Sequence, residues 1–413
     1  MSEKTLVGSL IIGQSGGPSA VINCSAYGVI KTGLENPNIT KVYGAFHGIK
    51  GVLNDQLMIM DEEDPKELEN MLYTPSSALG SCRYKIADPD VDDTDYKRIL
   101  EIFKKYNVRY FFYNGGNDSM DTCNKISKYM SRVGYECRVM GVPKTIDNDL
   151  AGTDHCPGFA SAAKYIATSV MEVSRDCHVY VTGMVTIIEC MGRHAGWLTA
   201  AAALAGLKGD GPDLIYLPEV DFNMDQFVAD VKRVYNEKKN CIVAVSEGVH
   251  YADGTFVSEA KTSGTDGFGH AQLGGLAARL ADVVKTATGA KVRPIELSLL
   301  QRCAAHCASG TDIAESFMSG KVAVEAAVSG ITDKMVGFQC TRDGGYKCEP
   351  ALFDLNVVAN TEKKVPLEWI NEAHNGVTQG FIDYCLPLIQ GETGMVKEDG
   401  LPRFVQLKRV FAK

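Results

Sequence analysis

The stretch Pro143-Lys144-Thr145-Ile146-Asp147-Asn148-Asp149 directly follows the apolar run Arg138-Val139-Met140-Gly141-Val142. The run has the composition of a buried strand, and such a strand delivers the acidic stretch to the carboxyl edge of a sheet, where open α/β folds bind ligands. In an extended chain Thr145, Asp147 and Asp149 point to one side. A hydroxyl and two carboxylates on one face favour a metal, a cation or a substrate hydroxyl as their partner. An acidic Asx-turn explains the same residues equally well.

Length and charge limit the class of protein. The chain has 413 residues and a formal net charge of -9, and its length favours two or three domains of ~150 residues each. The acidic balance argues against nucleic-acid and anionic-membrane partners, although local amides and cations can still bind phosphate. No signal peptide is recognised, and no apolar run approaches the ~18 residues of a membrane span. We therefore expect a cytoplasmic protein without nucleic-acid or membrane partners.

The thirteen cysteines are an odd number and form no CxxC pair. This pattern is typical of reduced thiols in the cytosol. Cys303, His306 and Cys307 could suggest zinc, but they fall in an apolar helical run with no fourth ligand nearby. We interpret these three residues as part of the core.

Two glycine pairs each lie between a predicted strand and a predicted helix. Gly16-Gly17 follows the strand at 6–12, and Gly115-Gly116 follows the aromatic strand at 109–113. A helix N-terminus carries free N–H groups and about half a positive charge, and glycine lets a phosphate approach the backbone. Each pair is therefore a candidate anion site, with a simple structural turn as the alternative. Asp118, just after the second pair, is explained equally well as a helix N-cap.

The strand–loop–helix pattern repeats along most of the chain. Such repetition predicts an α/β fold with mostly parallel sheets and helices on both faces. The acidic residues at 61–64 are interpreted as a solvated face. Residues 350–413 are less regular than the rest, so we expect them to form an appended segment.

The glycine pairs and the acidic stretch belong to a longer series of motifs. By the order of these motifs along the chain, the protein resembles the phosphofructokinase superfamily. Within that superfamily it resembles the pyrophosphate-dependent branch, the diphosphate–fructose-6-phosphate 1-phosphotransferases. The resemblance covers roughly residues 6–340. The blocks that carry it are Gly16-Gly17, Gly80-Ser81-Cys82-Arg83, Gly115-Gly116-Asn117-Asp118-Ser119, Pro143 to Asp149 and Met191-Gly192-Arg193, extended by Glu247-Gly248, Arg293 and Gln301-Arg302.

The resemblance implies two similar three-layer α/β domains with mostly parallel sheets and an active site in the cleft between them. Residues 1–155 with about 301–345 would bind the donor phosphates, and about 156–300 would bind the sugar phosphate. Residues 346–413 would be the appended segment. The resemblance also implies Mg²⁺ as cofactor, fructose 6-phosphate and diphosphate as substrates, and a homodimer or homotetramer.

The resemblance further implies a role for individual residues. Asp147 would act as the general base on the sugar 1-hydroxyl, with Lys144, Thr145 and Asp118 beside it in the catalytic group. Arg293 would reach the 6-phosphate across a subunit interface. The implied diphosphate site consists of Gly16, Gly17, Arg83, Gly116, Asp118 and Lys144. The implied fructose 6-phosphate site consists of Thr145, Ile146, Asp147, Met191, Gly192, Arg193, Glu247, Arg293 and Arg302.

Two residues favour diphosphate over ATP as donor. ATP-using relatives have glycine at the position of Asp118 and usually a small residue at that of Lys144. A carboxylate ~4 Å from the α-phosphate of ATP would cost ~4 kcal/mol at an effective dielectric near 20. The alternatives are an ATP-dependent 6-phosphofructokinase and a non-catalytic, sugar-phosphate-binding regulatory subunit.

The chain departs from the family pattern at three positions. Asn117 occupies the position of the acidic metal ligand, so we expect Asn117 or Asp118 to bind Mg²⁺ together with the diphosphate. Met184 stands where many relatives have an arginine for the 6-phosphate. Leu299 replaces a histidine or tyrosine. The last two changes remove polar contacts to the sugar phosphate.

Overall fold

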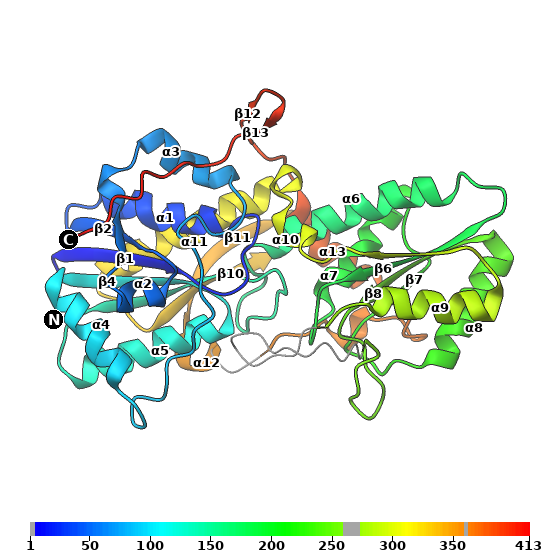
Figure 1. Ribbon diagram of the computed structural model, residues 1–413, viewed down its shortest axis with the longest axis horizontal. Coiled ribbons are helices and arrows are strands. Elements are labelled where there is room, and N and C mark those ends of the chain that lie inside the picture. The colour runs from blue at the N-terminus through cyan, green and yellow to red at the C-terminus, as the bar shows by residue number, and fades with distance from the viewer. Residues whose placement is uncertain (1–4, 259–272, 359–361) are drawn as a thin grey trace.

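Two β-sheets, one in each lobe of the molecule, organise the chain in the computed structural model (Figure 1). The structure describes residues 5–258, 273–358 and 362–413. The larger lobe holds a seven-stranded sheet in the order β11-β10-β5-β4-β1-β2-β3, and the smaller lobe holds a four-stranded sheet in the order β7-β8-β6-β9. The larger sheet comprises β1 (Gly8–Gln14), β2 (Ile39–Ala45), β3 (Leu57–Ile59), β4 (Val108–Gly115), β5 (Arg138–Pro143), β10 (Lys334–Thr341) and β11 (Lys347–Asp354). The smaller sheet comprises β6 (Met184–Cys190), β7 (Leu214–Tyr216), β8 (Asn240–Ser246) and β9 (Val292–Glu296).

Both sheets are mostly parallel, as the repeated strand–loop–helix pattern predicts. In the larger sheet only the edge strands β3 and β11 run antiparallel to their neighbours. All pairings within the smaller sheet are parallel. The expected α/β class with mostly parallel sheets is thus confirmed, although the two sheets differ in size.

Helices cover both faces of each sheet because the strands are apolar on both sides. In β1, Leu10 and Ile12 pack in the cluster formed with α1 and α11, whereas Ile11 packs in the cluster formed with α4 and α5. This alternation is the period of two expected of a strand. In the part of the chain that the structure describes, no helix is both long and apolar enough to cross a membrane. The helices are α1 (Ile22–Glu35), α2 (Ile49–Leu53), α3 (Pro65–Asn70), α4 (Thr94–Lys105), α5 (Asn117–Arg132), α6 (Phe159–Cys177), α7 (Trp197–Ala201), α8 (Met224–Lys238), α9 (Leu276–Thr288), α10 (Leu300–Cys303), α11 (Gly310–Val328), α12 (Leu355–Val358) and α13 (Gln379–Cys385).

Each sheet contains a topological switch point. In the larger sheet β1 lies between β2 and β4, and in the smaller sheet β6 lies between β8 and β9. The chain therefore leaves these central strands in opposite directions, which opens a crevice at their carboxyl ends. The loops after β1, β4 and β5 and those after β6 and β8 are consequently the places where a ligand site is expected.

Residues beyond 346 are integrated into both lobes. Strand β11 pairs with β10 along the whole length of both strands, and α13 packs in the core of the smaller lobe. The chain then returns to the larger lobe (Figure 1), where the backbone N–H of Ala412 donates to the carbonyl of Leu57 at 2.8 Å. The C-terminal segment thus ties the two lobes together. The proposed domain limits remain a prediction.

The interpretation of residues 61–64 as a solvated face is wrong for Glu63. This side chain is buried, and its carboxylate accepts backbone hydrogen bonds from Lys408 at 2.7 Å and Arg409 at 2.9 Å. A buried carboxylate needs such donors. They come from the far end of the chain, so no local pattern could reveal them.

Helices α1 and α11 approach each other closely at two glycines. A Cβ atom on Gly28 would overlap the carbonyl oxygen of Phe317, and one on Gly320 would overlap the carbonyl oxygen of Ser25. Both conflicts involve backbone atoms, which cannot rotate away as a side chain can. The helix pair therefore requires glycine at both positions.

We expect Gly320→Ala to destabilise the protein by ~1–3 kcal/mol through overpacking, although alanine is the better helix former by ~1 kcal/mol. The measurement is the melting temperature of the purified variant. Gly206→Ala is the matched control, because the nearest atom to a Cβ there is 4.0 Å away. Equal melting temperatures for the parent and Gly320→Ala would contradict the close-contact account.

Candidate active site

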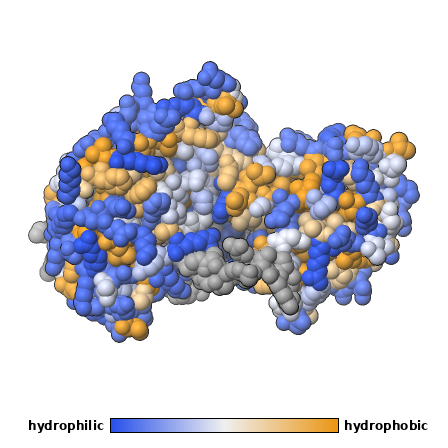
Figure 2. All heavy atoms as spheres, in the orientation of Figure 1, coloured by the Kyte–Doolittle hydropathy of each residue, from blue (hydrophilic) through white to orange (hydrophobic). Residues whose placement is uncertain are grey.

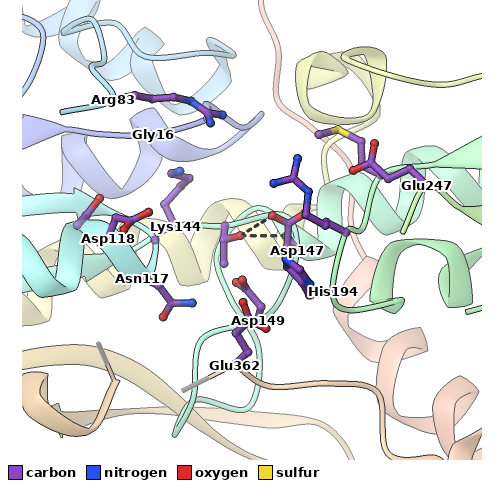
Figure 3. A pocket seen from close by; sticks show the side chains of 16 residues that line it. Gly16, Arg83, Asn117, Asp118, Lys144, Asp147, Asp149, His194, Glu247 and Glu362 are labelled. Atoms are coloured by element: carbon purple, nitrogen blue, oxygen red, sulfur yellow. Dashed lines mark hydrogen bonds between the residues drawn. The ribbon is translucent and has the colours of Figure 1, made fainter. Parts of the chain in front are cut away.

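Loops from both lobes and from the C-terminal segment line one cavity of about 380 Å³. On the face shown in Figure 2 the surface is hollowed between the lobes. The lining side chains converge from separate elements (Figure 3). The lining residues are Gly16, Gly17, Arg83, Gly116, Asn117, Asp118, Ser119, Lys144, Thr145, Asp147, Asp149, Met191, Arg193, His194, Glu247 and Glu362.

The stretch after β5 forms a turn around Asp147. The Asp147 N–H donates to Oγ1 of Thr145 at 3.1 Å, and the Thr145 hydroxyl lies 3.5 Å from Oδ2 of Asp147 (Figure 3). Asn148 has a φ of 56°, a conformation that asparagine tolerates better than most residues. The expectation of an extended chain is therefore wrong here. Thr145, Asp147 and Asp149 nevertheless all reach the cavity, because the turn replaces the alternation of a strand.

Lys144 points into the same cavity, although an extended chain would direct it away. It is only 4% exposed, and its backbone N–H donates to the carbonyl of Gly115 at 3.0 Å. A Cβ atom on Gly16 would lie 3.3 Å from Nζ of Lys144. Burial lowers the pKa of Lys144 to about 8, and the opposing effect of Asp147 and Asp149 keeps it from falling further. The cavity thus holds a buried cation at its centre.

Burial raises the pKa of each of three carboxyl groups in the cavity. For Asp147 the rise is opposed by the neighbouring Lys144. The pKa of Asp149 reaches about 7 because repulsion from Asp147 and Glu362 adds to burial. The pKa of Glu247 also reaches about 7, against the stabilising backbone N–H of Gly192. Groups of opposite charge whose pKa values approach neutrality are suited to proton transfer near pH 7.

Helix α5 directs its N-terminus at the cavity. Its N-cap is Gly116, which makes no side-chain cap hydrogen bond, so the alternative of Asp118 as N-cap is wrong. Asp118 instead lies in the first turn and forms an ion pair with Lys85 at 3.9 Å. Oδ1 of Asn117 is buried without a hydrogen-bond partner. The first turn of α5 therefore presents an acceptor and a carboxylate beside the free N–H groups of the helix end.

The first glycine pair lines the cavity without lying at a helix end. Gly16 has a φ of 75°, and α1 begins only at Ile22. The turn is held by the loop that carries Arg83, because the Gly16 N–H donates to the carbonyl of Cys82 at 3.1 Å and the Ser81 hydroxyl donates to the carbonyl of Gly16 at 2.7 Å. These contacts place the Arg83 guanidinium at the cavity (Figure 3).

The smaller lobe contributes the residues after β6 and β8. Met191, Arg193 and Glu247 line the cavity. The Gly192 N–H donates to Oε1 of Glu247 at 3.2 Å, which fixes this carboxylate beside Arg193. Arg193, a cation, and Glu247, a hydrogen-bond acceptor, thus lie on the smaller-lobe side of the cavity, opposite Asp147 of the larger lobe.

Four residues of the expected sugar-phosphate site, Ile146, Gly192, Arg293 and Arg302, are not among those that line the cavity. Ile146 packs in the core of the smaller lobe, and Arg293 is exposed on the edge strand β9. Arg302 lies against the glycine pair, since a Cβ atom on Gly17 would be 2.8 Å from its Nη1. Gly192 contributes through its backbone. Arg302 thus lies beside the glycine pair of the expected donor side and also acts on the charge of Asp147.

Met184 and Leu299, where the chain departs from the family pattern for sugar-phosphate binding, have different surroundings. Met184 is buried at the start of β6, at the opposite end of the strand from Met191. Leu299 is 54% exposed. Neither side chain lines the cavity.

The core interpretation of the cysteine–histidine group near residue 303 is wrong. Cys303 and His306 are exposed, and Cys307 is only partly buried. An apolar run predicted burial here, but the short α10 and the turn after it lie at the surface.

Several residues at the cavity were not predicted as site residues. Asp149 and Ser119 lie within the recognised motifs but were given no role there, and His194 directly follows the motif that ends at Arg193. Glu362 comes from a segment without a motif and carries no local signal. Lys85 lies two residues after the motif that ends at Arg83, and nothing local indicates its ion pair with Asp118. Glu362 is placed by the hydrogen bond from the Lys363 N–H to the carbonyl of Asp149 at 2.8 Å.

Comparisons with known proteins agree with this geometry. A family model described as Phosphofructokinase matches residues 9–327. A protein of Xanthomonas campestris pv. campestris, named pyrophosphate–fructose 6-phosphate 1-phosphotransferase, is 44% identical over 407 residues, which are 98% of this chain and 97% of that protein. A protein of Halomonas elongata with the same name is 43% identical over 400 residues, which are 96% of this chain and 95% of that protein. The crystal structure of a pyrophosphate-dependent phosphofructokinase from Nitrosospira multiformis has a TM-score of 0.90 and 39% identity, and covers 98% of both chains.

The raised pKa of Asp149 predicts a dependence of stability on pH. Its folded-state pKa of about 7 exceeds the unfolded value of ~4, so stability is lost as the pH rises toward and through about 7. Asp149→Asn removes this ionisation. We expect its melting temperature to exceed that of the parent at pH 8, with a difference that shrinks toward pH 5. Glu372→Gln, at an exposed carboxyl outside the cavity, should show no such trend, and equal stability of Asp149→Asn and parent at pH 8 would refute the assignment.

Proposed function

The chain belongs to the phosphofructokinase family, and from this premise we propose that it transfers a phosphoryl group from diphosphate to the 1-hydroxyl of fructose 6-phosphate. The products are fructose 1,6-bisphosphate and phosphate, and the transfer is reversible. The observation that carries the proposal is the buried Lys144 together with the partly buried Asp147 in one cavity between two α/β lobes. The names of the relatives at 43% and 44% identity support the choice of substrates.

Asp147 is the general base in this proposal. Phosphoryl transfer depends mainly on positioning and on neutralising charge, and a carboxylate can accept the hydroxyl proton as attack proceeds. Burial raises the pKa of Asp147, which makes it a stronger base than an exposed aspartate. Its hydrogen-bonded turn with Thr145 holds the carboxylate in place before the sugar binds.

The donor side carries the positive charge. Lys144, with a pKa of about 8, is mostly protonated at neutral pH, and Arg83 adds a planar fork that suits phosphate oxygens. Gly16, Gly17 and the N-terminus of α5 supply backbone surface without side chains. Diphosphate is compact and lacks the apolar adenosine, so a small polar site rich in cations favours it over ATP.

Asp118 opposes the binding of ATP less strongly than a buried, unpaired carboxylate would. Its side chain is 35% exposed and forms an ion pair with Lys85, so solvent and the neighbouring cation weaken its repulsion of an α-phosphate. The buried Lys144 is therefore the stronger determinant of the donor.

The sugar side is built from Arg193, Glu247 and the backbone of Gly192. Glu247 accepts hydrogen bonds, as a sugar hydroxyl requires, and Arg193 can bind phosphate oxygens. Arg302, lying against Gly17, stands between the two substrate sides. These residues orient the 1-hydroxyl toward Asp147.

The residues beside Asp147 fit a Mg²⁺ ion. Mg²⁺ prefers oxygen ligands and commonly joins one or two carboxylates to substrate phosphates. Asn117 offers a buried oxygen without a partner, and Asp118, Asp149 and Glu362 line the same cavity. We propose that Asn117, Asp149 and Glu362 hold the ion, with Asp118 at the edge of the site. The ion would neutralise charge on the diphosphate.

The exposure of Arg293 supports assembly of the protein as a homodimer or homotetramer. It lies on an edge strand whose residues are half-buried or exposed, where a second copy could receive it. The thirteen unpaired cysteines support a cytoplasmic location.

Donor use separates the proposal from its two alternatives. Purified protein is assayed with fructose 6-phosphate and Mg²⁺, with diphosphate or ATP as the sole donor. We expect turnover with diphosphate only. Turnover with ATP alone would favour an ATP-dependent 6-phosphofructokinase. Binding of fructose 6-phosphate without turnover on either donor would favour a regulatory subunit.

Asp118→Gly combined with Lys144→Gly should shift the ratio of kcat/KM values for diphosphate and ATP toward ATP. The reason is that the pair removes both the cation that favours diphosphate and the carboxylate that opposes ATP. We expect Lys144→Gly alone to produce most of the loss with diphosphate. Asp121→Gly, on the next turn of α5 and paired with Lys125, is the control. An unchanged ratio in the double variant would remove the two-residue account of donor choice.

Glu362→Gln should weaken metal binding by about tenfold or more, in the range of changes around metal ligands. The measurement is electron paramagnetic resonance of Mn²⁺ as a Mg²⁺ substitute, titrated into the protein with methylenediphosphonate present. Glu368→Gln, an exposed residue of the same segment, is the control. Equal Mn²⁺ affinity in Glu362→Gln and parent would exclude Glu362 as a ligand.

A further inference from the structure

The edge hairpin of the larger sheet contains two cysteines that the proposed reaction does not use. Strands β10 and β11 pair antiparallel, and their register places Cys340 directly opposite Cys348. Directly opposed residues of antiparallel strands have Cα atoms ~4.5–5.5 Å apart and side chains on one face. This separation lies within the ~4.4–6.8 Å that disulfides span. Both thiols are unpaired and partly exposed, so they can react without unfolding of the hairpin.

A buried imidazole lies beside Cys340. Sγ of Cys340 is 3.8 Å from Nδ1 of His155, whose side chain is 1% exposed. The His155 ring also contacts two carboxylates, Oε2 of Glu315 at 2.7 Å from Nε2 and Oδ1 of Asp154 at 3.1 Å from Nδ1. Burial opposes protonation of His155, but these hydrogen bonds raise its pKa well above the ordinary value. The group next to Cys340 is therefore an imidazolium cation.

The two thiols have unequal acidity. A hydrogen bond from Cys348 and the neighbouring His155 cation lower the pKa of Cys340 to about 6, against the effect of burial. The hydroxyl of Tyr346 lies 3.5 Å from the same sulfur. The pKa of Cys348 is raised, first by its hydrogen bond to Cys340. Because the thiolate is the nucleophile, the geometry gives Cys340 the attacking role and Cys348 the resolving role.

We propose that Cys340 and Cys348 form a peroxide-reactive dithiol that closes reversibly into a disulfide. The Cys340 thiolate attacks one oxygen of a hydroperoxide, the O–O bond breaks, and the leaving oxygen takes a proton to give water or an alcohol. Cys340 is then a sulfenic acid. The Cys348 sulfur attacks the Cys340 sulfur, the S–O bond breaks, and the hydroxide leaves as water with the thiol proton of Cys348. The two thiols lose two electrons and two protons in total, and the peroxide is reduced.

The test treats the full-length protein with one to two equivalents of hydrogen peroxide, blocks the remaining thiols by alkylation and maps peptides without reduction. We expect the Cys340 and Cys348 peptides to be joined, with the loss of two hydrogens, before the exposed Cys303 is modified. Dithiothreitol should restore both thiols. Modification of Cys303 first, or continued alkylation of Cys340 and Cys348 after peroxide, would overturn the proposal.

Three variants separate the attacking thiol from the resolving thiol. In Cys348→Ser, a sulfenic acid should accumulate on Cys340 and be trapped by dimedone. In Cys340→Ser, Cys348 should remain reduced. Cys303→Ser should behave as the parent does. Trapping at Cys348 in the Cys340→Ser variant, at the rate seen for Cys340, would refute the assigned roles.

The rate of reaction with peroxide tests the surroundings of Cys340. The titratable groups around it are Asp154 and His155 from the loop before α6, Glu315 from α11, and Arg342, Tyr346 and Cys348 from the hairpin. If Cys340 is a thiolate in this environment, the rate should change little between pH 7 and pH 9. A rate that rises through pH 8–9, as for an ordinary thiol with a pKa of ~8.5, would contradict the account.

Discussion

One buried ammonium group sets the conditions for the whole cavity. Lys144 is 4% exposed, and a cation so far from water requires nearby negative charge. Asp147 and Asp149 provide it, and the lysine in turn opposes the rise that burial causes in the pKa of Asp147. Gly16 has a φ of 75°, which favours glycine, and a Cβ there would lie 3.3 Å from Nζ of Lys144. A cationic donor side and a basic carboxylate are therefore two consequences of the same arrangement.

The C-terminal segment keeps this arrangement in place. The Asn148 side-chain amide donates to Oη of Tyr384 at 2.8 Å, and the Lys363 N–H donates to the carbonyl of Asp149 at 2.8 Å. Nζ of Lys363 also donates to the carbonyl of Asp154 at 2.6 Å. These contacts hold the end of the turn that carries Asp147 and the backbone that follows it. A segment that looks irregular in sequence thus pre-organises the catalytic turn, which lowers the cost of positioning during the reaction.

Local sequence predicted the strands and the glycine pairs, and the resemblance to the phosphofructokinase superfamily supplied most of the cavity residues. Gly16, Arg83, Asn117, Lys144, Asp147, Arg193 and Glu247 converge because each follows the carboxyl end of a parallel strand or a loop pinned to one, and that periodicity is local. At Thr145–Asp147 a turn, which the sequence left as an alternative, replaces the extended chain, because the Thr145 hydroxyl accepts a backbone N–H and overrides the alternation of a strand. Glu63, Lys85 and Glu362 could not be predicted, since their partners come from distant parts of the chain. The assignment of Arg302 to the sugar-phosphate site stays a prediction; in the structure its guanidinium lies against Gly17.

The central claim is that the protein uses diphosphate as its phosphoryl donor. The reverse reaction, which forms diphosphate from fructose 1,6-bisphosphate and orthophosphate, tests this claim most directly. Purified protein is incubated with fructose 1,6-bisphosphate, orthophosphate and Mg²⁺, and the products are followed by ³¹P nuclear magnetic resonance. The account predicts growth of the diphosphate signal together with that of fructose 6-phosphate, and no ATP when ADP replaces orthophosphate. Formation of ATP from ADP, with no diphosphate from orthophosphate, would contradict the account.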